Sequence, residues 1–336
     1  MTQETETVSI EAAEALIRAA LERSGASGAA AQSTAQALVA AEAEGQVGHG
    51  FSRLADYAAQ LRSGKIDGGA VPTCSREDSA ALVIDAGHGL AYPALDLAIA
   101  RGTQAADRFG CATMAVTRSH HCGALSVQVE RIARAGQIGL MMANAPAAIA
   151  PWGSKVPVFG TNPIAFAAPR RDGTPLVIDL SLSRVARGKV MHARKSGQPI
   201  PLGWALDPEG NPTTDPEAGL AGSMVPIGEA KGTALALMVE ILAAVLTGAN
   251  PSTSVTSFFT ADGPPPNAGQ FLMALKPADP AAFAARLEPV LEGIAALEGA
   301  RLPGTRRAAA IARARAEGIA VPRHYLDLAR QLGEAR

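Results

Sequence analysis

Apolar residues recur at helical spacing near both ends of the chain, whereas its middle alternates short apolar runs with helical stretches. A recurrence of roughly 3.6 residues marks one face of a helix, and a short apolar run bounded by turn residues is typical of a buried strand. The pattern predicts helices at residues 8–23, 29–44, 51–63, 93–108, 125–135, 232–246, 280–297, 306–317 and 322–333. It predicts strands at residues 81–85, 111–117, 138–143, 163–168, 176–180 and 271–275.

This order of elements predicts an α/β fold with helical flanks from both termini. We divide the chain into an N-terminal helical segment at residues 1–70, an α/β region at 71–250, and a segment at 251–336 that adds a strand and helices. Neither an internal repeat nor a low-complexity linker is evident, so we expect a single catalytic unit.

The composition narrows the classes of partner. The 336 residues include Lys+Arg 30 and Asp+Glu 31, a formal net charge of -1, which gives no reason to expect a nucleic-acid partner. The acidic N-terminus lacks the apolar core of a signal peptide, and no run of about 18 apolar residues could span a membrane, so we expect a cytoplasmic protein. The cysteines, Cys74, Cys111 and Cys122, lack metal-binding spacing, so we interpret them as reduced thiols.

His49 precedes Arg53 by four residues, just after the predicted helix at 29–44. On a helix, two residues at this spacing project to the same side. An imidazole can transfer a proton near neutral pH, and a guanidinium can hold a carboxylate beside it. The pair therefore predicts a site for proton transfer to a substrate that carries a carboxylate.

Residues 87–92 follow a strand and open a helix, as the phosphate loop of a Rossmann fold does. The third glycine of that loop is missing here, and Asp107 lies at the end of the same helix rather than at the tip of a second strand. We therefore interpret the segment as a glycine turn that lets helix and strand pack closely.

Three further segments place polar residues at the ends of predicted elements. Residues 119–125 begin a helix whose free backbone amides can hold an anion, and Gly123 would let a pyrophosphate approach. The two adjacent histidines in this segment cannot both face one point, so no metal site is expected. Asp179 ends a buried strand, where its carboxylate needs partners. Lys231 stands at a helix start, against the helix dipole, and an anionic ligand would offset that.

Several motifs, taken in order, resemble those of the type 2 malate/L-lactate dehydrogenase family of NAD(P)-dependent oxidoreductases. That family includes malate, ureidoglycolate and sulfolactate dehydrogenases and the Δ1-piperideine-2-carboxylate/Δ1-pyrroline-2-carboxylate reductases. The resemblance implies a cofactor-binding mixed sheet unlike the Rossmann arrangement, and a homodimer or an assembly of dimers. It extends over nearly the whole chain, at residues 49–54, 119–125, 159–166, 185–189, 203–205, 212–216, 231–232 and 238–248.

The resemblance also implies roles for residues of this chain. His49 would be the proton donor, Arg53 would bind the substrate carboxylate, and Thr161 would contact the substrate. The cofactor would be lined by His121, Cys122, Gly123, Ala124, Leu125, Asp179, Leu180, Ser181, Arg187, Gly188, Ala230, Lys231, Arg301, Gly304, Arg306 and Arg307.

These roles extend to the three parts of the chain. Residues 1–70 would carry the catalytic histidine, 71–250 would bind cofactor and substrate, and 251–336 would complete the cofactor site. The three arginines around the turn at 301–307 could take a ribose 2′-phosphate, so NADPH is expected over NADH, which stays possible.

Two places depart from the family pattern: Gly228-Glu229 replaces a more common Gly-Gly pair in the expected cofactor loop, and the residue before the expected proton donor differs. Members usually carry a serine immediately before the catalytic histidine, positioned to orient it, and this chain has Gly48. Either Ser52, a bound water or a backbone group replaces that hydrogen bond, or proton transfer is slower. A non-catalytic binding homologue is disfavoured, because His49, Arg53 and Lys231 are all present.

Two segments point to different substrates. The doubled histidine at 120–121 resembles the ketimine reductases, whereas residues 185–189 resemble the hydroxy-acid enzymes. A compact, uncharged ring suits the apolar loop at 145–149, because a second acidic group would need a cation and the local sequence offers only Lys155. We therefore predict NAD(P)H-dependent reduction of Δ1-pyrroline-2-carboxylate or Δ1-piperideine-2-carboxylate to L-proline or L-pipecolate, with His49 as proton donor. The alternative is a 2-hydroxy-acid dehydrogenase of the sulfolactate, malate or lactate type.

Overall fold

The computed structural model of the chain describes residues 4–334. Its centre is a seven-stranded mixed sheet, in which the β3–β4 pair is parallel and the other pairs are antiparallel. The predicted α/β fold with a mixed sheet is therefore confirmed. In spatial order the strands are β2 (Thr73–Ser75), β3 (Ala81–Asp85), β4 (Cys111–Ser119), β11 (Ala268–Leu275), β5 (Ile138–Ala143), β6 (Ile164–Ala168) and β7 (Leu176–Leu180).

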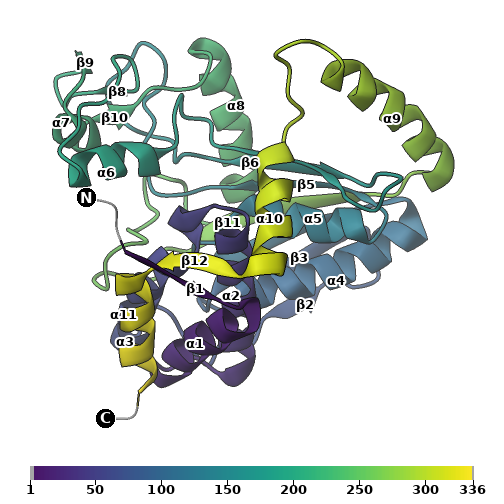
Figure 1. Cartoon of the computed structure of the whole chain (residues 1–336), viewed down its shortest axis with the longest axis horizontal. Helices are drawn as coiled ribbons and strands as arrows, with labels where there is room; N and C mark the ends of the chain where they lie inside the picture. The colour runs from purple at the N-terminus through teal and green to yellow at the C-terminus, as the bar shows by residue number, and fades with distance from the viewer. Residues whose placement is uncertain (1–3, 335–336) are drawn as a thin grey trace.

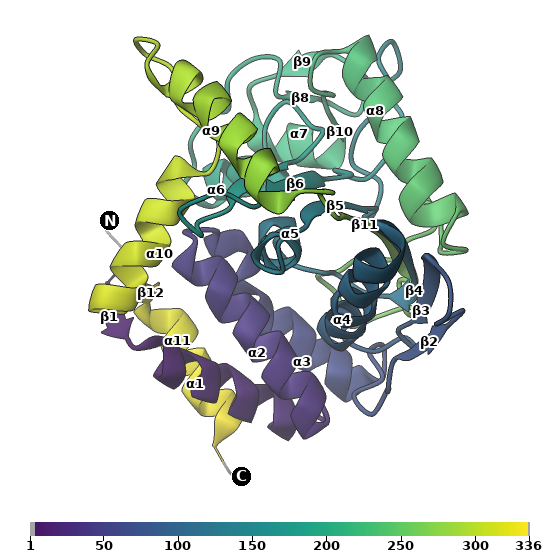
Figure 2. The same cartoon turned by 90° about the vertical axis from the view of Figure 1, so that its right-hand side faces the viewer.

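Helices cover both faces of this sheet (Figure 2). On one face lie α4 (Ala91–Phe109) and α5 (Leu125–Arg134). On the other lies α8 (Ala230–Glu240), continued by the π-helical turn η3 (Ile241–Val245). The predicted helix at 232–246 is thus an α-helix that changes to π-helical hydrogen bonding before it ends, a feature often found at functional sites.

A second layer joins the two ends of the chain (Figure 1). Its apolar core includes Ile17, Leu38 and Tyr57, together with Val321 and Leu326 from the C-terminal end. The predicted helical flanks from both termini are therefore confirmed, and they pack on one another. The layer comprises α1 (Ile10–Arg23), α2 (Gly28–Ala43), α3 (Leu54–Ser63), α11 (Arg323–Gly333) and the antiparallel pair β1 (Thr5–Val8) and β12 (Ile319–Pro322).

A small lobe follows β7 along the chain, in a stretch for which the sequence predicted no elements, and its apolar residues pack with Met142 of β5 and Ile164 of β6. Its three-stranded sheet has strands of two residues each, too short for a hydrophobic period to reveal. The lobe contains β8 (Ala205–Leu206), β9 (Pro212–Thr213), β10 (Ser223–Met224), α6 (Arg187–Lys195) and α7 (Pro216–Ala221), and the remaining helices of the fold are α9 (Pro280–Ala295) and α10 (Thr305–Glu317).

The glycine turn at 87–92 packs against the protein itself. A Cβ on Gly89 would lie 2.7 Å from the Ala70 Cβ, which explains the close approach of this turn. Asp107 pairs with Lys276, with 2.9 Å between carboxylate and ammonium. The Rossmann interpretation was therefore correctly rejected. Across the described residues, no helix is both long enough and apolar enough to cross a membrane.

Candidate active site

The predicted pair His49 and Arg53 lies in two successive 3₁₀ turns, η1 (Val47–His49) and η2 (Phe51–Arg53). Gly50 separates the turns with backbone angles of φ −103° and ψ −132°. The expectation that both residues share one continuous helical turn is therefore wrong.

A buried carboxylate produces this break. Glu42 Oε2 accepts a hydrogen bond of 2.9 Å from the Phe51 N–H, and a Cβ on Gly50 would lie 1.9 Å from the same oxygen. Burial raises the pKa of Glu42 to about 7, although the Phe51 N–H opposes this. Glycine is needed at position 50 because the Glu42 side chain fills the space behind it.

The His49 ring stacks on the His121 ring, with centroids 5.4 Å apart and planes 13° from parallel. Burial lowers the pKa of His49 to about 4, and the charge of Arg53 adds to this. Burial likewise lowers the pKa of His121 well below its ordinary value, with Arg53 again contributing. Both imidazoles are therefore neutral near neutral pH. This corrects the expectation that the His49 pKa would lie near the working pH.

The doubled histidine has two different surroundings. His121 Nδ1 and the Tyr57 hydroxyl share a hydrogen bond of 2.5 Å. His120 points elsewhere, and its Nε2 lies 2.8 Å from the Gln60 Oε1 in a buried contact. Adjacent histidines thus face different points, as predicted. Within the part of the chain that the structure describes, no group of three His, Cys, Asp or Glu side chains could hold a metal ion.

Arg53 is held by three contacts. Its Nε donates to the Gly48 carbonyl at 2.7 Å, its Nη1 lies 3.6 Å from Asp56 Oδ2, and its Cζ lies 4.5 Å from the centroid of the Phe259 ring. A guanidinium has five N–H donors, so this arrangement fixes its plane and leaves donors for an anionic ligand.

Among residues 4–334, no side chain or backbone group takes the place of the serine hydroxyl that family members carry before the catalytic histidine. Ser52 donates its hydroxyl to the Val47 carbonyl at 2.6 Å, so it does not orient the imidazole. His49 Nδ1 is buried without a hydrogen-bond partner among residues 4–334. Nothing lies within 4 Å of the place where a Cβ on Gly48 would stand, so this space is open.

Thr161 lies in a turn that a second buried carboxylate holds. The next residue, Asn162, is fully buried at φ +38°, and its Nδ2 donates to Glu240 Oε2 at 2.9 Å. The same carboxylate oxygen accepts from the Ser252 hydroxyl at 2.7 Å. Sequence reasoning missed Glu240, although an acidic residue inside an otherwise apolar helix must find buried partners and was a usable signal.

The start of α5 is less open to a phosphate than the sequence suggested. Asp179 Oδ2 accepts a hydrogen bond of 2.8 Å from the Ser126 N–H, which removes one of the amides expected to be free. A Cβ on Gly123, at φ +69°, would lie 2.7 Å from the Tyr92 hydroxyl oxygen. Packing against Tyr92 therefore requires this glycine independently of any ligand.

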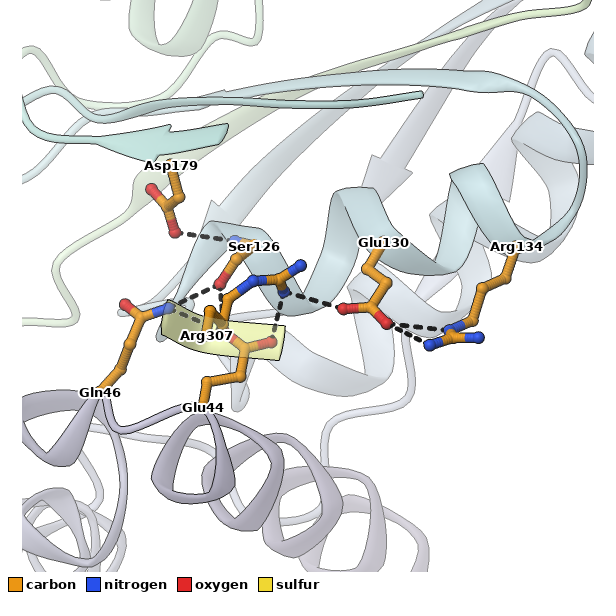
Figure 3. A network of polar contacts seen from close by, with 7 residues as sticks. All are labelled: Glu44, Gln46, Ser126, Glu130, Arg134, Asp179 and Arg307. Atoms are coloured by element: carbon orange, nitrogen blue, oxygen red, sulfur yellow. Dashed lines mark hydrogen bonds and ion pairs between the residues drawn. The ribbon is translucent and has the colours of Figure 1, made fainter. Parts of the chain in front are cut away.

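A network of charged side chains continues from this point (Figure 3). Arg307 Nη1 lies 2.8 Å from both Glu44 Oε1 and Glu130 Oε2. The other Glu44 oxygen accepts from the Ser126 hydroxyl at 2.6 Å and from the Gln46 amide at 2.8 Å. Because Gln46 directly precedes η1, the network connects the start of α5 to the turn that carries His49.

The three arginines of the 301–307 segment differ in their surroundings. Arg301 and Arg306 are exposed, whereas the Arg307 side chain is 13% exposed and engaged by two carboxylates. A Cβ on Gly304 would lie 2.7 Å from the Val177 carbonyl, so the segment lies against β7. Two exposed arginines therefore flank the glycine that touches this strand, rather than the three that the sequence suggested.

The remaining predicted cofactor residues lie at the ends of elements. Arg187 begins α6 and is partly buried, which lowers its pKa. Ala230 and Lys231 begin α8 and are exposed. Burial raises the pKa of Cys122 to about 12, so this thiol stays protonated. The others are Ala124 and Leu125 at the start of α5, Leu180 and Ser181 at the end of β7, and Gly188 in α6.

Comparison with known proteins decides the family. Residues 8–328 match the family described as malate/L-lactate dehydrogenase. The chain belongs to this family. It is 48% identical over 332 residues, 98% of both sequences, to a (2R)-3-sulfolactate dehydrogenase (NADP(+)) from Chromohalobacter salexigens. It is 40% identical over 296 residues, 87% of this chain and 88% of the relative, to a Δ1-pyrroline-2-carboxylate/Δ1-piperideine-2-carboxylate reductase from Pseudomonas aeruginosa.

A solved structure of this malate/L-lactate dehydrogenase family has the same fold. The Δ1-piperideine-2-carboxylate reductase from Pseudomonas syringae superposes with a TM-score of 0.92 and 37% identity, covering 98% of this chain and 100% of that one. Together these relatives identify the chain as an NAD(P)-dependent oxidoreductase. The resemblance inferred from the sequence motifs is confirmed.

Several residues around the site of this family member were not anticipated. Tyr57 contacts His121, and two neighbouring rings, Phe258 and Phe259, pack on His121 and Arg53. Aromatic residues make up only 4% of the chain, so an adjacent pair in a polar loop was a signal that sequence reasoning left unused.

Proposed function

We propose that the chain is an NADP(H)-dependent 2-hydroxy-acid dehydrogenase whose substrate carries a second anionic group, as 3-sulfolactate does. The observation that carries this proposal is the 48% identity, over 98% of both sequences, with the (2R)-3-sulfolactate dehydrogenase (NADP(+)). The identity with the pyrroline-2-carboxylate reductase from Pseudomonas aeruginosa is lower, at 40%. The proposal reverses the order in which the sequence alone ranked the two substrate classes.

The charges near Arg53 support a dianionic substrate. Burial raises the pKa of Asp56, while Arg53 and Lys195 both oppose this shift. Lys195 therefore lies within electrostatic reach of Asp56, the carboxylate 3.6 Å from the Arg53 Nη1. The sequence argument against a second acidic group considered only Lys155, because it could not anticipate that α6 would bring Lys195 to this place.

The proton step follows from the state of His49. Burial keeps the imidazole neutral, and a neutral imidazole can accept the hydroxyl proton when a 2-hydroxy acid is oxidised. Bound NADP⁺ would supply the hydride acceptor. Arg53 would hold the carboxylate through paired N–H donors, and Thr161 would contact the substrate. In the reverse direction, a carboxylate on Arg53 would offset the charge that lowers the His49 pKa, so the imidazolium would form more readily.

The cations among the residues predicted to line the cofactor suit a dinucleotide phosphate. Arg301 and Arg306 present exposed guanidinium groups beside β7, and Lys231 adds an exposed ammonium at the start of α8. A guanidinium pairs well with a phosphate, and an NADPH 2′-phosphate would offset the repulsion between neighbouring cations. NADPH is therefore the proposed cofactor, with NADH as a weaker substitute.

The second candidate is a cyclic 2-imino acid. It is favoured by the solved Δ1-piperideine-2-carboxylate reductase structure, whose TM-score of 0.92 covers nearly all of both chains. The ring of Phe258, packed against His121, would also suit an uncharged ring. The doubled histidine supports a cyclic imino acid less than the sequence suggested, because His120 faces Gln60 rather than His49.

The deciding experiment measures NADPH oxidation with sulfopyruvate, oxaloacetate, pyruvate, Δ1-pyrroline-2-carboxylate and Δ1-piperideine-2-carboxylate, each repeated with NADH. We expect the highest kcat/KM with sulfopyruvate and NADPH. Efficient turnover of the cyclic imines with sulfopyruvate untouched would overturn the proposal in favour of the second candidate.

A variant sharpens the same test. Lys195→Met should raise the KM for sulfopyruvate by roughly tenfold, the cost of about 1.4 kcal/mol, and leave the KM for pyruvate unchanged. The control is Lys189→Met, an exposed cation on the same helix. Equal changes for the singly and doubly charged acids would refute a role for Lys195 in binding the second anion.

We also propose that two copies associate through the apolar face of α8 and η3. Leu237, Ile241 and Val245 are 49%, 48% and 70% exposed on consecutive turns. Exposed apolar patches of this kind mark protein interfaces. Sedimentation of Ile241→Asp should give a monomer where the wild-type protein gives a dimer, and an unchanged dimer would exclude this face.

A further inference from the structure

Residues 257–262 form an irregular segment that packs on α3 and carries two aromatic rings. The Phe259 ring lies under the guanidinium of Arg53, with Cζ 4.5 Å from its centroid. The Phe258 ring lies 5.4 Å from the ring of His121. The position of this segment therefore sets the surroundings of the arginine proposed to bind the substrate carboxylate.

Lys65 holds this segment through hydrogen bonds to its backbone. It follows α3, is 3% exposed, and donates from Nζ to the carbonyl oxygens of Ser257 at 2.8 Å, Thr260 at 2.9 Å and Asp262 at 2.9 Å. These bonds use all three donors of the ammonium group. Backbone carbonyls outside regular structure need partners, and here one buried side chain satisfies three of them.

Two neighbours of Lys65 extend the attachment. The Ser63 hydroxyl donates to the Ala261 carbonyl at 3.0 Å, and the Gln60 amide donates to the Phe258 carbonyl at 2.9 Å. The carbonyls of 257, 258, 260, 261 and 262 thus all accept from side chains of α3 or from Lys65, two residues beyond its end. Gln60 is also the partner of His120, so the same helix positions the segment and the histidine pair.

We propose that Lys65 is a positioning residue for the substrate carboxylate. By fixing the 257–262 segment, it holds Phe259 against Arg53 and so keeps the guanidinium in its binding orientation. This inference rests on the proposed role of Arg53 and applies equally to a 2-oxo acid and a cyclic imino acid, because both carry the carboxylate. Lys65 does not touch the substrate and takes no part in proton transfer.

The first test replaces the ammonium group with an apolar side chain of similar length. Lys65→Met should raise the substrate KM by about three- to tenfold, the range expected for loss of a cation–π contact, and leave the KM for NADPH unchanged. The control is Arg62→Met, an exposed cation on the same helix. Unchanged substrate KM, or equal increases for substrate and NADPH, would overturn the proposal.

A double-mutant cycle separates positioning from general stability. If Lys65 acts through Phe259, then Lys65→Met combined with Phe259→Leu should raise the KM no more than the larger single change, because contacting residues are not additive. Independent multiplication of the two effects would refute the link. Should Lys65→Met fail to fold, Lys65→Arg takes its place in the cycle, since its fork cannot direct donors to three convergent carbonyls.

Chemical rescue completes the experiment. Lys65→Ala leaves space for a small amine, so propylammonium should lower its substrate KM towards the wild-type value, whereas propanol should not. Absence of rescue in a folded variant counts against the ammonium as the anchor. A failure of the proposed function can be told apart from a failure of the role proposed for Lys65. If wild-type protein prefers cyclic imines to sulfopyruvate, the substrate assignment falls, but the KM cycle with the preferred substrate still tests Lys65.

Discussion

The proposed substrate side and the proposed cofactor side of this site meet at the turn carrying His49, and their charges are balanced in different ways. On the substrate side His49, His120 and His121 are buried and neutral, and Arg53 contacts a carbonyl, an aromatic ring and, more loosely at 3.6 Å, the Asp56 carboxylate. On the cofactor side Arg307 is paired with two carboxylates. The substrate side is thus arranged to receive charge from a ligand, whereas the network around Arg307 balances its charges within the protein.

This difference explains why one site can bind an anion and move a proton. An arginine beside a buried imidazole lowers the imidazole pKa, and an anion bound to that arginine raises the pKa again. The ion-pair network has no such dependence, because its charges compensate one another with or without a ligand. We therefore expect substitutions on the substrate side to change catalysis, and substitutions in the network to change stability.

The largest expected effect comes from removing the imidazole on the substrate side. His49→Ala should lower kcat by roughly 10²- to 10⁴-fold, because proton transfer loses its acceptor and donor, while NADPH binding persists. Steady-state kinetics and fluorescence titration with NADPH measure the two quantities. His324→Ala, an exposed histidine on α11, is the control. Near-normal turnover in His49→Ala would contradict its assignment and remove the basis of the comparison.

The next effect tests the network. Arg307→Met should lower the free energy of unfolding by about 3–5 kcal/mol, because it leaves Glu44 as an uncompensated buried charge, whereas Glu130 keeps its ion pair with Arg134. It should change the KM values for NADPH and NADH equally. The adjacent and exposed Arg306→Met should leave stability unchanged and raise the KM for NADPH alone. An Arg307→Met protein of normal stability with a selective NADPH defect would show that this arginine is an open phosphate ligand after all.

A smaller effect is expected in the pH dependence of stability. Burial, and to a smaller extent Lys65, lowers the His120 pKa to about 3. Between about pH 6.5 and pH 3 the unfolded chain therefore binds a proton at this histidine that the folded chain does not bind. Stability contributed by neutral His120 is therefore present above the ordinary pKa of about 6.5 and is lost as pH falls from there towards about 3. His49 acts in the same direction, whereas Glu42, with its pKa raised to about 7, acts oppositely between its unfolded value and 7.

The variant His120→Gln isolates the contribution of His120 to the pH dependence of stability. Its free energy of unfolding should fall less than that of the wild-type protein between pH 6.5 and pH 4, as measured by urea denaturation at each pH. Parallel pH curves for the two proteins would mean that His120 is not kept neutral by burial, and the substrate side would lose one of its defining features.

Local sequence patterns predicted the long elements well, and they failed where pairing is distant or short. The helices at 93–108 and 125–135 agree with α4 and α5 to within two residues at each end. Strands β1 and β12 were missed, because each is stabilised mainly by the opposite end of the chain. The strand at 271–275 is longer in the structure, where β11 lies between β4 and β5 in the middle of the sheet.

The candidate site shows the same limit. His49 and Arg53 were found because their spacing is local, but the glycine between them breaks the helix on account of Glu42, whose role is visible only in packing. Lys65 was missed because its carbonyl partners lie 192 to 197 residues away. A lysine in a loop carries no sequence signal of burial, so only the fold could reveal this contact.

The smallest expected effect comes from a change at Gly48, in the turn where the two sides of the site meet. Nothing lies within 4 Å of a Cβ at position 48, and Gly48 does not adopt a left-handed conformation, so Gly48→Ser should fold without strain. The new hydroxyl can reach the unpartnered His49 Nδ1 and accept a hydrogen bond from its N–H when the ring is charged, which favours the imidazolium. The Gly48 carbonyl would keep its bond to Arg53, because only a side chain is added.

Gly48→Ser should therefore raise kcat for reduction by about three- to tenfold, the value of one hydrogen bond, and move the His49-dependent limb of the pH–rate profile towards higher pH. Gly293→Ser, at an equally open glycine in α9, is the matched control and should change neither quantity. A faster enzyme with an unmoved pH profile would mean that the serine orients the ring without stabilising its charge. Unchanged rate and profile together would mean that a glycine at position 48 costs the proton transfer nothing, and that burial and Arg53 alone set the behaviour of His49.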